Sequence, residues 1–163
     1  MSKILVRHGL SEANNRNNHG NLALAGASAP LMKEGFAQAR EAGQLLVARY
    51  GVEILSEPAA VSTMRRTQET ADTLGLTNQT LYPELQEVAH GMDLADLRQL
   101  LSSGDLPDAA LRTAEDLLDN PPAEGLWVTH GLVIAGLCRV LGVERDYDRL
   151  IPRFCEIREL PIN

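Results

Sequence analysis

The sequence predicts an α/β fold, a three-layer α/β/α sandwich around a mostly parallel sheet. Two observations support this class: short apolar runs alternate with amphipathic helical segments along all 163 residues, and neither internal repeats nor a linker interrupts them. A third is that two of the apolar runs end in the same dipeptide, His8-Gly9 and His130-Gly131. A chain of this length buries about two-thirds of its unfolded surface in one core, so we expect a single domain over residues 1–163.

The strands are expected where short apolar runs end at a polar loop. The first run, Ile4 to Val6, leads directly to Arg7 and His8, and the run before His130 has the same form. The last strand is assigned from strict alternation of side chains and is placed at an edge, before Pro161. The predicted strands are residues 4–6, 59–61, 79–82, 125–129 and 154–160.

The helices are expected where apolar residues recur at helical spacing. The first covers residues 33–50 and lacks a capping side chain at Met32, which should cost about 1 kcal/mol. Ser62 or Thr63 is expected to cap the second helix, and Asp93 and Asp108 the next two. The inward positions expected for the first helix are Phe36, Ala39, Gly43, Leu46, Val47 and Tyr50. The predicted later helices are residues 64–74, 93–101, 132–141 and one from Asp108 to just before Asn120.

Composition excludes several classes of protein. The formal net charge of −7 argues against a nucleic-acid partner, and no stretch approaches the roughly 18 apolar residues of a membrane span. The apolar run near the start is too short for a signal peptide, so we expect a cytoplasmic protein. Cys138 and Cys155 have no metal-ligand spacing and are expected to be buried free thiols.

Polar side chains gather where the predicted strands end. In a parallel sheet these ends meet at one edge, so His8, His130, an arginine pair and a carboxylate should lie together. Two imidazoles with guanidinium groups, without cysteines or a carboxylate cluster, suit a phosphate dianion better than a metal. A neutral imidazole can attack phosphorus while a carboxylic acid protonates the leaving oxygen, with no metal or cofactor expected.

These sequence patterns do not show which of Arg65 and Arg66, or which of Glu84 and Glu87, belongs to the site. The asparagine-rich segment 10–30 has no periodicity and is expected to form half of this site.

The chain resembles the histidine phosphatase superfamily, which includes the cofactor-dependent phosphoglycerate mutases. Residues 7–14, RHGLSEAN, match its signature Arg-His-Gly-x-Ser/Thr-x-x-Asn. Further similar segments follow in the family's order along nearly the whole chain. They are Pro30-Leu31 with Gly35 and Gln38-Ala39, residues 62–71 (STMRRTQETA), Leu85-Gln86-Glu87 and Thr129-His130-Gly131.

The resemblance implies a phosphoglycerate mutase-like sandwich and assigns the site residue by residue. His8 would be the nucleophile that forms a phosphohistidine, and Glu87 the acid and base. Arg66 is selected over Arg65 because the family's binding arginine stands four residues before the threonine that matches Thr70. The phosphate or substrate contacts implied are Arg7, Arg66, His130, Asn14, Ser11 and Gly131.

The departures from the family pattern bear on the reaction. Met32, Ala29 and Thr63 replace residues that concern the scaffold, and the aromatic-rich segment that many members carry after Glu87 is missing. The segment 88–122, expected to form a short helical lid, has no lysine and only two arginines. A mutase must hold a second anionic group, so this sparse charge favours a small metal-independent phosphatase acting on a phosphomonoester.

Other functions stay open at this point. The alternatives are a phosphohistidine phosphatase, a phosphoglycerate mutase-type phosphotransferase and a non-catalytic phosphate-binding module. The sequence does not predict the substrate, the oligomeric state, or whether His19 and His90 contact the substrate.

Overall fold

A five-stranded sheet forms the centre of the computed structural model, which describes residues 1–14, 26–88, 94–143 and 147–163. The strand order is β3-β2-β4-β1-β5, with β5 antiparallel and the other strands parallel. The sheet is therefore mostly parallel, and its antiparallel strand lies at the edge, as predicted. The strands are β1 (Lys3–Arg7), β2 (Ala59–Ser62), β3 (Gln79–Tyr82), β4 (Leu126–Thr129) and β5 (Ile157–Leu160).

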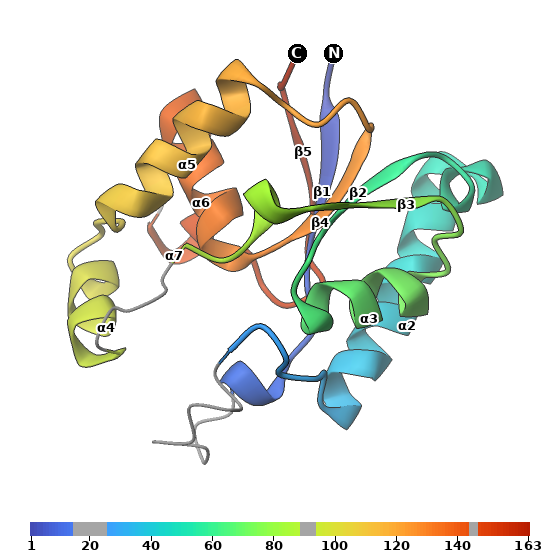
Figure 1. Cartoon of the computed structure of the whole chain (residues 1–163), viewed down its shortest axis with the longest axis horizontal. Coiled ribbons are helices and arrows are strands. Elements are labelled where there is room, and N and C mark those ends of the chain that lie inside the picture. Colours follow the sequence, from blue (N-terminus) through green and yellow to red (C-terminus); the bar gives the residue numbers. More distant parts are fainter. Residues whose placement is uncertain (15–25, 89–93, 144–146) are drawn as a thin grey trace.

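Helices cover both faces of this sheet, which confirms the three-layer architecture (Figure 1). On one face, α2 packs beside α3; on the other, α5 packs beside α6. The short helical segments η1 (Glu12–Asn14), η3 (Val52–Leu55) and η4 (Pro83–Leu85) lie in the connections. The α-helices are α2 (Lys33–Tyr50), α3 (Arg65–Leu74), α4 (Leu94–Ser102), α5 (Asp108–Asp119), α6 (Gly131–Leu141) and α7 (Tyr147–Leu150).

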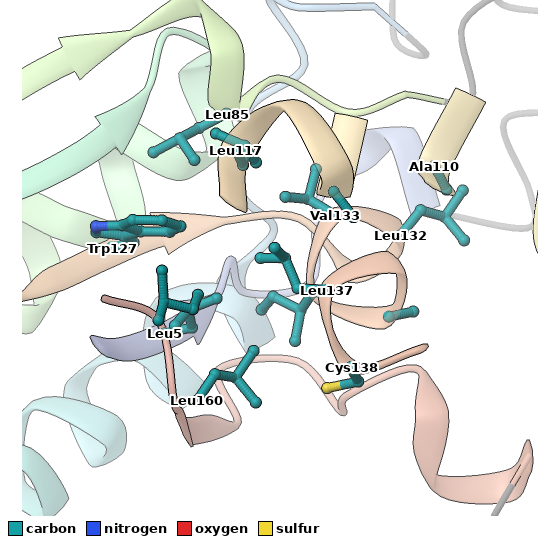
Figure 2. Close-up of a cluster of buried hydrophobic side chains, with 14 of the residues drawn as sticks. Leu5, Leu85, Ala110, Leu117, Trp127, Leu132, Val133, Leu137, Cys138 and Leu160 are labelled. Atoms are coloured by element: carbon teal, nitrogen blue, oxygen red, sulfur yellow. The ribbon is translucent and has the colours of Figure 1, made fainter. Parts of the chain in front are cut away.

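Alternation along the strands divides the core into two clusters, because successive side chains of a strand point to opposite faces. Leu5 and Trp127 face α5 and α6, whereas Val6 and Val128 face α2 and α3. Figure 2 shows the first cluster, in which Trp127 lies on the same side of the sheet as Leu117 of α5 and Leu137 of α6. Every residue of α6 from Gly131 to Cys138 is buried, as its continuous apolar sequence requires.

The first helix confirms one prediction and corrects another. Met32 is its N-cap and no side chain caps it. The buried face, however, is rotated from the predicted one, because Phe36 and Val47 are only half-buried, whereas Gly35 and Ala42 are buried. Its buried residues are Gly35, Ala39, Ala42, Gly43 and Leu46.

Two predicted helix caps are wrong. Helix α3 begins at Arg65, and its N-cap, Met64, provides no capping side chain. Ser62 still belongs to β2, and its hydroxyl is hydrogen-bonded to the His130 ring. Helix α5 has Pro107 in extended backbone at the cap position, so Asp108 is its first helical residue. An acidic residue there still suits the positive end of the helix. The predicted cap Asp93 lies outside the described residues.

The last strand is shorter than predicted. It begins at Ile157 rather than at Phe154, because Phe154 and Cys155 form a turn. Cys155 has a positive φ of 56°, which no β-strand accommodates, and its N–H donates to the carbonyl oxygens of Arg7 and His8. Both cysteines are buried and free, as predicted.

The segment expected to form a lid contains two different kinds of helix. Helix α5 packs on α6 and contributes Ala110, Ala114 and Leu117 to the core, so it belongs to a layer of the sandwich. Helix α4 only places Leu97 and Leu101 against this cluster, and a lid at α4 stays a prediction. Within the described ranges, no helix has the length and apolar character needed to cross a membrane.

Candidate active site

Parallel pairing of β1 with β4 brings the two histidine motifs together. Arg7 is the register partner of Thr129, and the His8 N–H donates to the Thr129 carbonyl oxygen over 3.0 Å. Each histidine is the next residue after this pair. The imidazole ring centroids of His8 and His130 therefore lie 5.1 Å apart in an edge-to-face arrangement, and both rings are almost completely buried.

Hydrogen bonding fixes the tautomer of His8. Its Nδ1 lies 2.7 Å from the Gly9 carbonyl oxygen, and since a carbonyl can only accept, Nδ1 carries the proton. The lone pair is then on Nε2. Burial, followed by the positive charges of Arg66 and Arg7, lowers the pKa of His8 well below its usual value of 6.5. At neutral pH the ring is therefore an uncharged base with one available nitrogen.

The loop after His8 is held by both helices of the adjacent layer. The Gly9 N–H donates to Thr70 Oγ1 over 3.0 Å, and the Leu10 N–H donates to Gln38 Oε1 over 2.9 Å. A Cβ on Gly9 would lie 2.6 Å from the Gly35 carbonyl oxygen, so glycine is needed for this approach of the loop to α2. Gly35 and Gln38, which belong to the segments similar to the family, thus help to position the loop.

Arg7 is fixed from several sides at the end of β1. One terminal nitrogen donates to the Pro152 carbonyl oxygen over 2.7 Å, and the guanidinium carbon lies 4.1 Å from the centre of the Phe154 ring. A Cβ on Gly131 would lie 3.0 Å from this guanidinium, so the glycine leaves the space that Arg7 fills. Burial lowers the pKa of Arg7 to about 10, which still leaves it charged at neutral pH.

The two adjacent arginines of α3 differ completely. Arg66 is buried, with 5% of its surface exposed, and one terminal nitrogen donates to the Gly26 carbonyl oxygen. Arg65 is exposed and forms an ion pair with Glu69 one turn along the helix. Burial lowers the pKa of Arg66, and the negative charge of Glu87 opposes this shift. Arg66 is therefore the α3 arginine that faces His8.

Two buried guanidinium donors have no acceptor among the described residues. They are the Nε–H groups of Arg7 and Arg66. A buried donor without an acceptor costs about 1–3 kcal/mol, and more when it is charged. Two such cationic donors beside a neutral imidazole describe a site that an anion would complete.

Glu87 faces the same site from the segment after β3. Glu87 follows η4 by two residues, and η4 is tied to β4 because the Thr129 hydroxyl donates to the Leu85 carbonyl oxygen over 2.8 Å. Burial raises the pKa of Glu87 above its usual value of 4.5, although the Val88 N–H, Arg66, Arg7 and the Leu132 N–H act against this rise. The carboxyl group therefore holds its proton to higher pH than an exposed glutamate. Glu84, its alternative in sequence, is exposed.

His130 is oriented by a residue of the neighbouring strand. Its Nε2 lies 2.9 Å from the Ser62 hydroxyl at the end of β2, and this hydroxyl also accepts the Met64 N–H. His130 is at the same time the N-cap of α6, so the ring lies at the positive end of that helix. The ring is thereby placed beside His8 in a defined orientation.

The remaining predicted contacts lie at the border of the site. Ser11 is buried and its hydroxyl donates to Asn14 Oδ1 over 2.7 Å, while Asn14 is exposed. His19 and His90 lie outside the described residues. Within residues 1–14, 26–88, 94–143 and 147–163, no group of three or more His, Cys, Asp or Glu side chains is placed to hold a metal ion.

The site includes residues whose roles the sequence does not reveal. Sequence patterns indicate Ser62 only as a helix cap, and Thr70 only as part of a family segment. The same patterns assign Phe154 to a strand. In the structure Phe154 lies in a turn, because the next residue, Cys155, has a positive φ. The one available signal is proximity: β5 pairs antiparallel with β1, so the residues before β5 lie beside the end of β1.

A protein-family comparison identifies the class to which this site belongs. Residues 3–125 match the model of the histidine phosphatase superfamily (branch 1). The chain therefore belongs to this superfamily, whose members are phosphatases or mutases. The match includes Arg7, His8, Arg66 and Glu87 and ends before His130.

Solved structures with the same fold cover nearly the whole chain. The protein TTHB049 from Thermus thermophilus has a TM-score of 0.69 at 24% identity, covering 99% of this chain and 94% of that one. A phosphoglycerate mutase from the same organism has a TM-score of 0.64 at 24% identity, covering 99% and 93%. Phosphoserine phosphatase from Entamoeba histolytica, solved with 3-phosphoglyceric acid, has a TM-score of 0.65 at 19% identity, covering 97% and 89%. No curated protein sequence gives a significant match.

The opposite placement of Arg66 and Arg65 gives a direct test of the site's electrostatics. Removing a nearby positive charge makes protonation of His8 easier, so Arg66→Met should raise the pKa of His8 towards 6.5. Arg65→Met is the matched control and should leave it unchanged, because Arg65 is exposed and ion-paired. Titration of the imidazole by NMR measures both. Equal shifts in the two variants would contradict the arrangement.

Proposed function

We propose that the protein is a metal-independent phosphatase that hydrolyses a small phosphomonoester through a phosphohistidine on His8. The observation that carries this proposal is the pairing of a buried neutral imidazole with two buried guanidinium donors that lack an acceptor in the described part of the chain. A phosphoryl group would supply the missing acceptors and would place phosphorus next to Nε2. Membership of a superfamily of phosphatases and mutases supports the same reaction.

In the first half-reaction, His8 Nε2 attacks phosphorus. The N–P bond forms as the bond between phosphorus and the leaving oxygen breaks, and the Glu87 carboxyl group gives its proton to that oxygen. Arg7, Arg66 and His130 bind the equatorial oxygens, where charge is spread in the transition state. The raised pKa of Glu87 supports this role, because the group must be protonated when the alcohol leaves.

In the second half-reaction, water takes the place of the alcohol. The Glu87 carboxylate accepts a proton from water as its oxygen attacks phosphorus, the N–P bond breaks, and inorganic phosphate and free His8 are formed. The hydrogen bond from Nδ1 to Gly9 holds the ring in one orientation through both steps. No group has to change its position between them.

Hydrolysis is favoured over a mutase reaction by the charges near the site. Arg98 and Arg112 are the two basic residues among Lys and Arg in segment 88–122, and both are exposed, so the segment offers little charge for a second anionic group. The solved relatives include both a phosphoglycerate mutase and a phosphoserine phosphatase, so they support either reaction. The cytoplasmic location remains an expectation of the sequence, and buried free cysteines are compatible with it.

Two alternatives follow from the same geometry. A phosphohistidine substrate would leave as an imidazole and would need less help from an acid, so a Glu87 carboxyl group with a raised pKa favours phosphate esters. A non-catalytic phosphate-binding module would use the same donors without turnover.

The proposal predicts hydrolysis that needs His8 and no metal. We expect turnover with chelator present on at least one member of a panel containing p-nitrophenyl phosphate, sugar phosphates, phosphoglycerates, nucleotides and phosphohistidine. His8→Ala should lower kcat by about three orders of magnitude or more, because it removes the nucleophile. Binding of vanadate without turnover on any substrate would replace the phosphatase with the binding module, and preferred turnover of phosphohistidine would select the first alternative.

The role of Glu87 predicts a dependence on the leaving group. Glu87→Gln should lower kcat/KM, which reports on the first half-reaction, by about 10²-fold or more for an alkyl phosphate but by much less for p-nitrophenyl phosphate, because p-nitrophenolate leaves without a proton. For alkyl substrates, the acid limb of kcat/KM should have an apparent pKa well below 6.5, where His8 takes up a proton, and the alkaline limb an apparent pKa above 4.5, where Glu87 loses its proton. Glu87→Gln should remove the alkaline limb. Glu84→Gln, an exposed control, should change neither; equal losses for both substrates in Glu87→Gln would exclude the acid role.

A further inference from the structure

Phe154 contacts both residues of the Arg7-His8 pair. Its ring lies 4.1 Å from the guanidinium carbon of Arg7 and 6.0 Å, centre to centre, from the His8 ring. The distance to Arg7 is well inside the range for a cation–π contact, which is strongest where both groups are shielded from water. Arg7 is such a case, because burial is the first cause of its lowered pKa.

The ring does not serve the hydrophobic core. Phe154 is half-buried, and neither core cluster of the described residues includes it. Its ring contacts are with a cation and an imidazole of the candidate site. Simple packing therefore does not account for an aromatic residue at this position.

The backbone that carries Phe154 is bonded to the same two residues. Phe154 and Cys155 are the middle residues of a turn closed by the Glu156 N–H, which donates to the Arg153 carbonyl oxygen. The Cys155 N–H donates to the carbonyl oxygens of Arg7 and His8 over 3.0 and 3.3 Å. The positive φ of Cys155 costs energy in a residue other than glycine, and it is retained where it directs the turn towards β1.

We propose that Phe154 is a positioning residue whose ring holds the Arg7 guanidinium in the orientation that binds a phosphoryl group. The Pro152 carbonyl oxygen fixes one terminal nitrogen of Arg7, and the ring fixes the plane of the guanidinium. The Nε–H then stays directed at the site without a protein acceptor among the described residues. This inference rests on the proposed function in one respect, the binding of a phosphoryl group by Arg7.

The test compares the loss of the aromatic face with the loss of volume. Phe154→Leu keeps an apolar side chain but removes the ring, whereas Phe154→Tyr keeps the ring. Phe36→Leu is the matched control, because Phe36 is the chain's other phenylalanine and is also half-buried, on α2. The readouts are the dissociation constant for orthovanadate, kcat/KM for p-nitrophenyl phosphate, and the thermal midpoint.

We expect Phe154→Leu to weaken vanadate binding and to lower kcat/KM by about 5- to 30-fold, the range that a shielded cation–π contact provides. Phe154→Tyr and Phe36→Leu should stay within about twofold of the wild type. In an Arg7→Met background, Phe154→Leu should have almost no further effect, because a positioning residue acts only through the group that it positions.

Several results would overturn the inference. An unchanged Phe154→Leu, equal losses in the Leu and Tyr variants that follow the thermal midpoint, or full additivity with Arg7→Met would each show that the ring only packs. A wild type that binds vanadate without turnover would refute the proposed phosphatase, yet the vanadate affinities would still decide the role of Phe154. A wild type that does neither would refute both.

Discussion

Every part of the candidate site depends on the pairing of Arg7 with Thr129 across β1 and β4. This register sets two histidines beside each other, since each follows its strand by one residue, and the neighbouring β2 brings Ser62 to the second ring. If β1 slipped by one residue, the side chains of Arg7 and His8 would each move to the other face of the sheet. The two apolar clusters prevent such a slip, because Leu5 and Trp127 on one face, and Val6 and Val128 on the other, would exchange environments.

The charge distribution of the site carries a cost to stability. Two guanidinium groups are buried around an imidazole whose pKa they help to lower, and the nearby Glu87 has a raised pKa that reduces its own compensating charge. Below pH 6.5 the unfolded chain takes up a proton on His8 that the folded chain resists, so stability contributed by the neutral ring is lost as the pH falls. An anion that satisfies the donors of Arg7 and Arg66 would stabilise the folded protein. Function and stability are thus coupled through the same buried cations.

Most of this fold can be predicted from the sequence, but the candidate site can be predicted only in part. Apolar runs and helical periodicity locate the strands and helices, because burial on one face or both leaves a clear pattern in the chain. The same patterns cannot separate Arg66 from Arg65, since both lie in the first turn of α3, and only resemblance to a family selects Arg66. Phe154 escapes sequence reasoning because its position depends on a left-handed residue, Cys155, and on pairing between β5 and β1 that no local pattern encodes. The sequence predicts Ser62 as a helix cap because its actual partner, His130, is distant in the sequence and close only in the fold.

The central claim is that His8 Nε2 becomes covalently bonded to phosphorus. The most direct measurement is to mix the enzyme with an efficiently hydrolysed substrate, quench in alkali within the first turnover, and locate the phosphoryl group by peptide mass spectrometry and ³¹P NMR. We expect an acid-labile phosphoryl group on Nε2 of His8, because Nδ1 is protonated and hydrogen-bonded to the Gly9 carbonyl oxygen. A phosphoryl group on Nδ1, on another residue, or on no residue while turnover continues would contradict it.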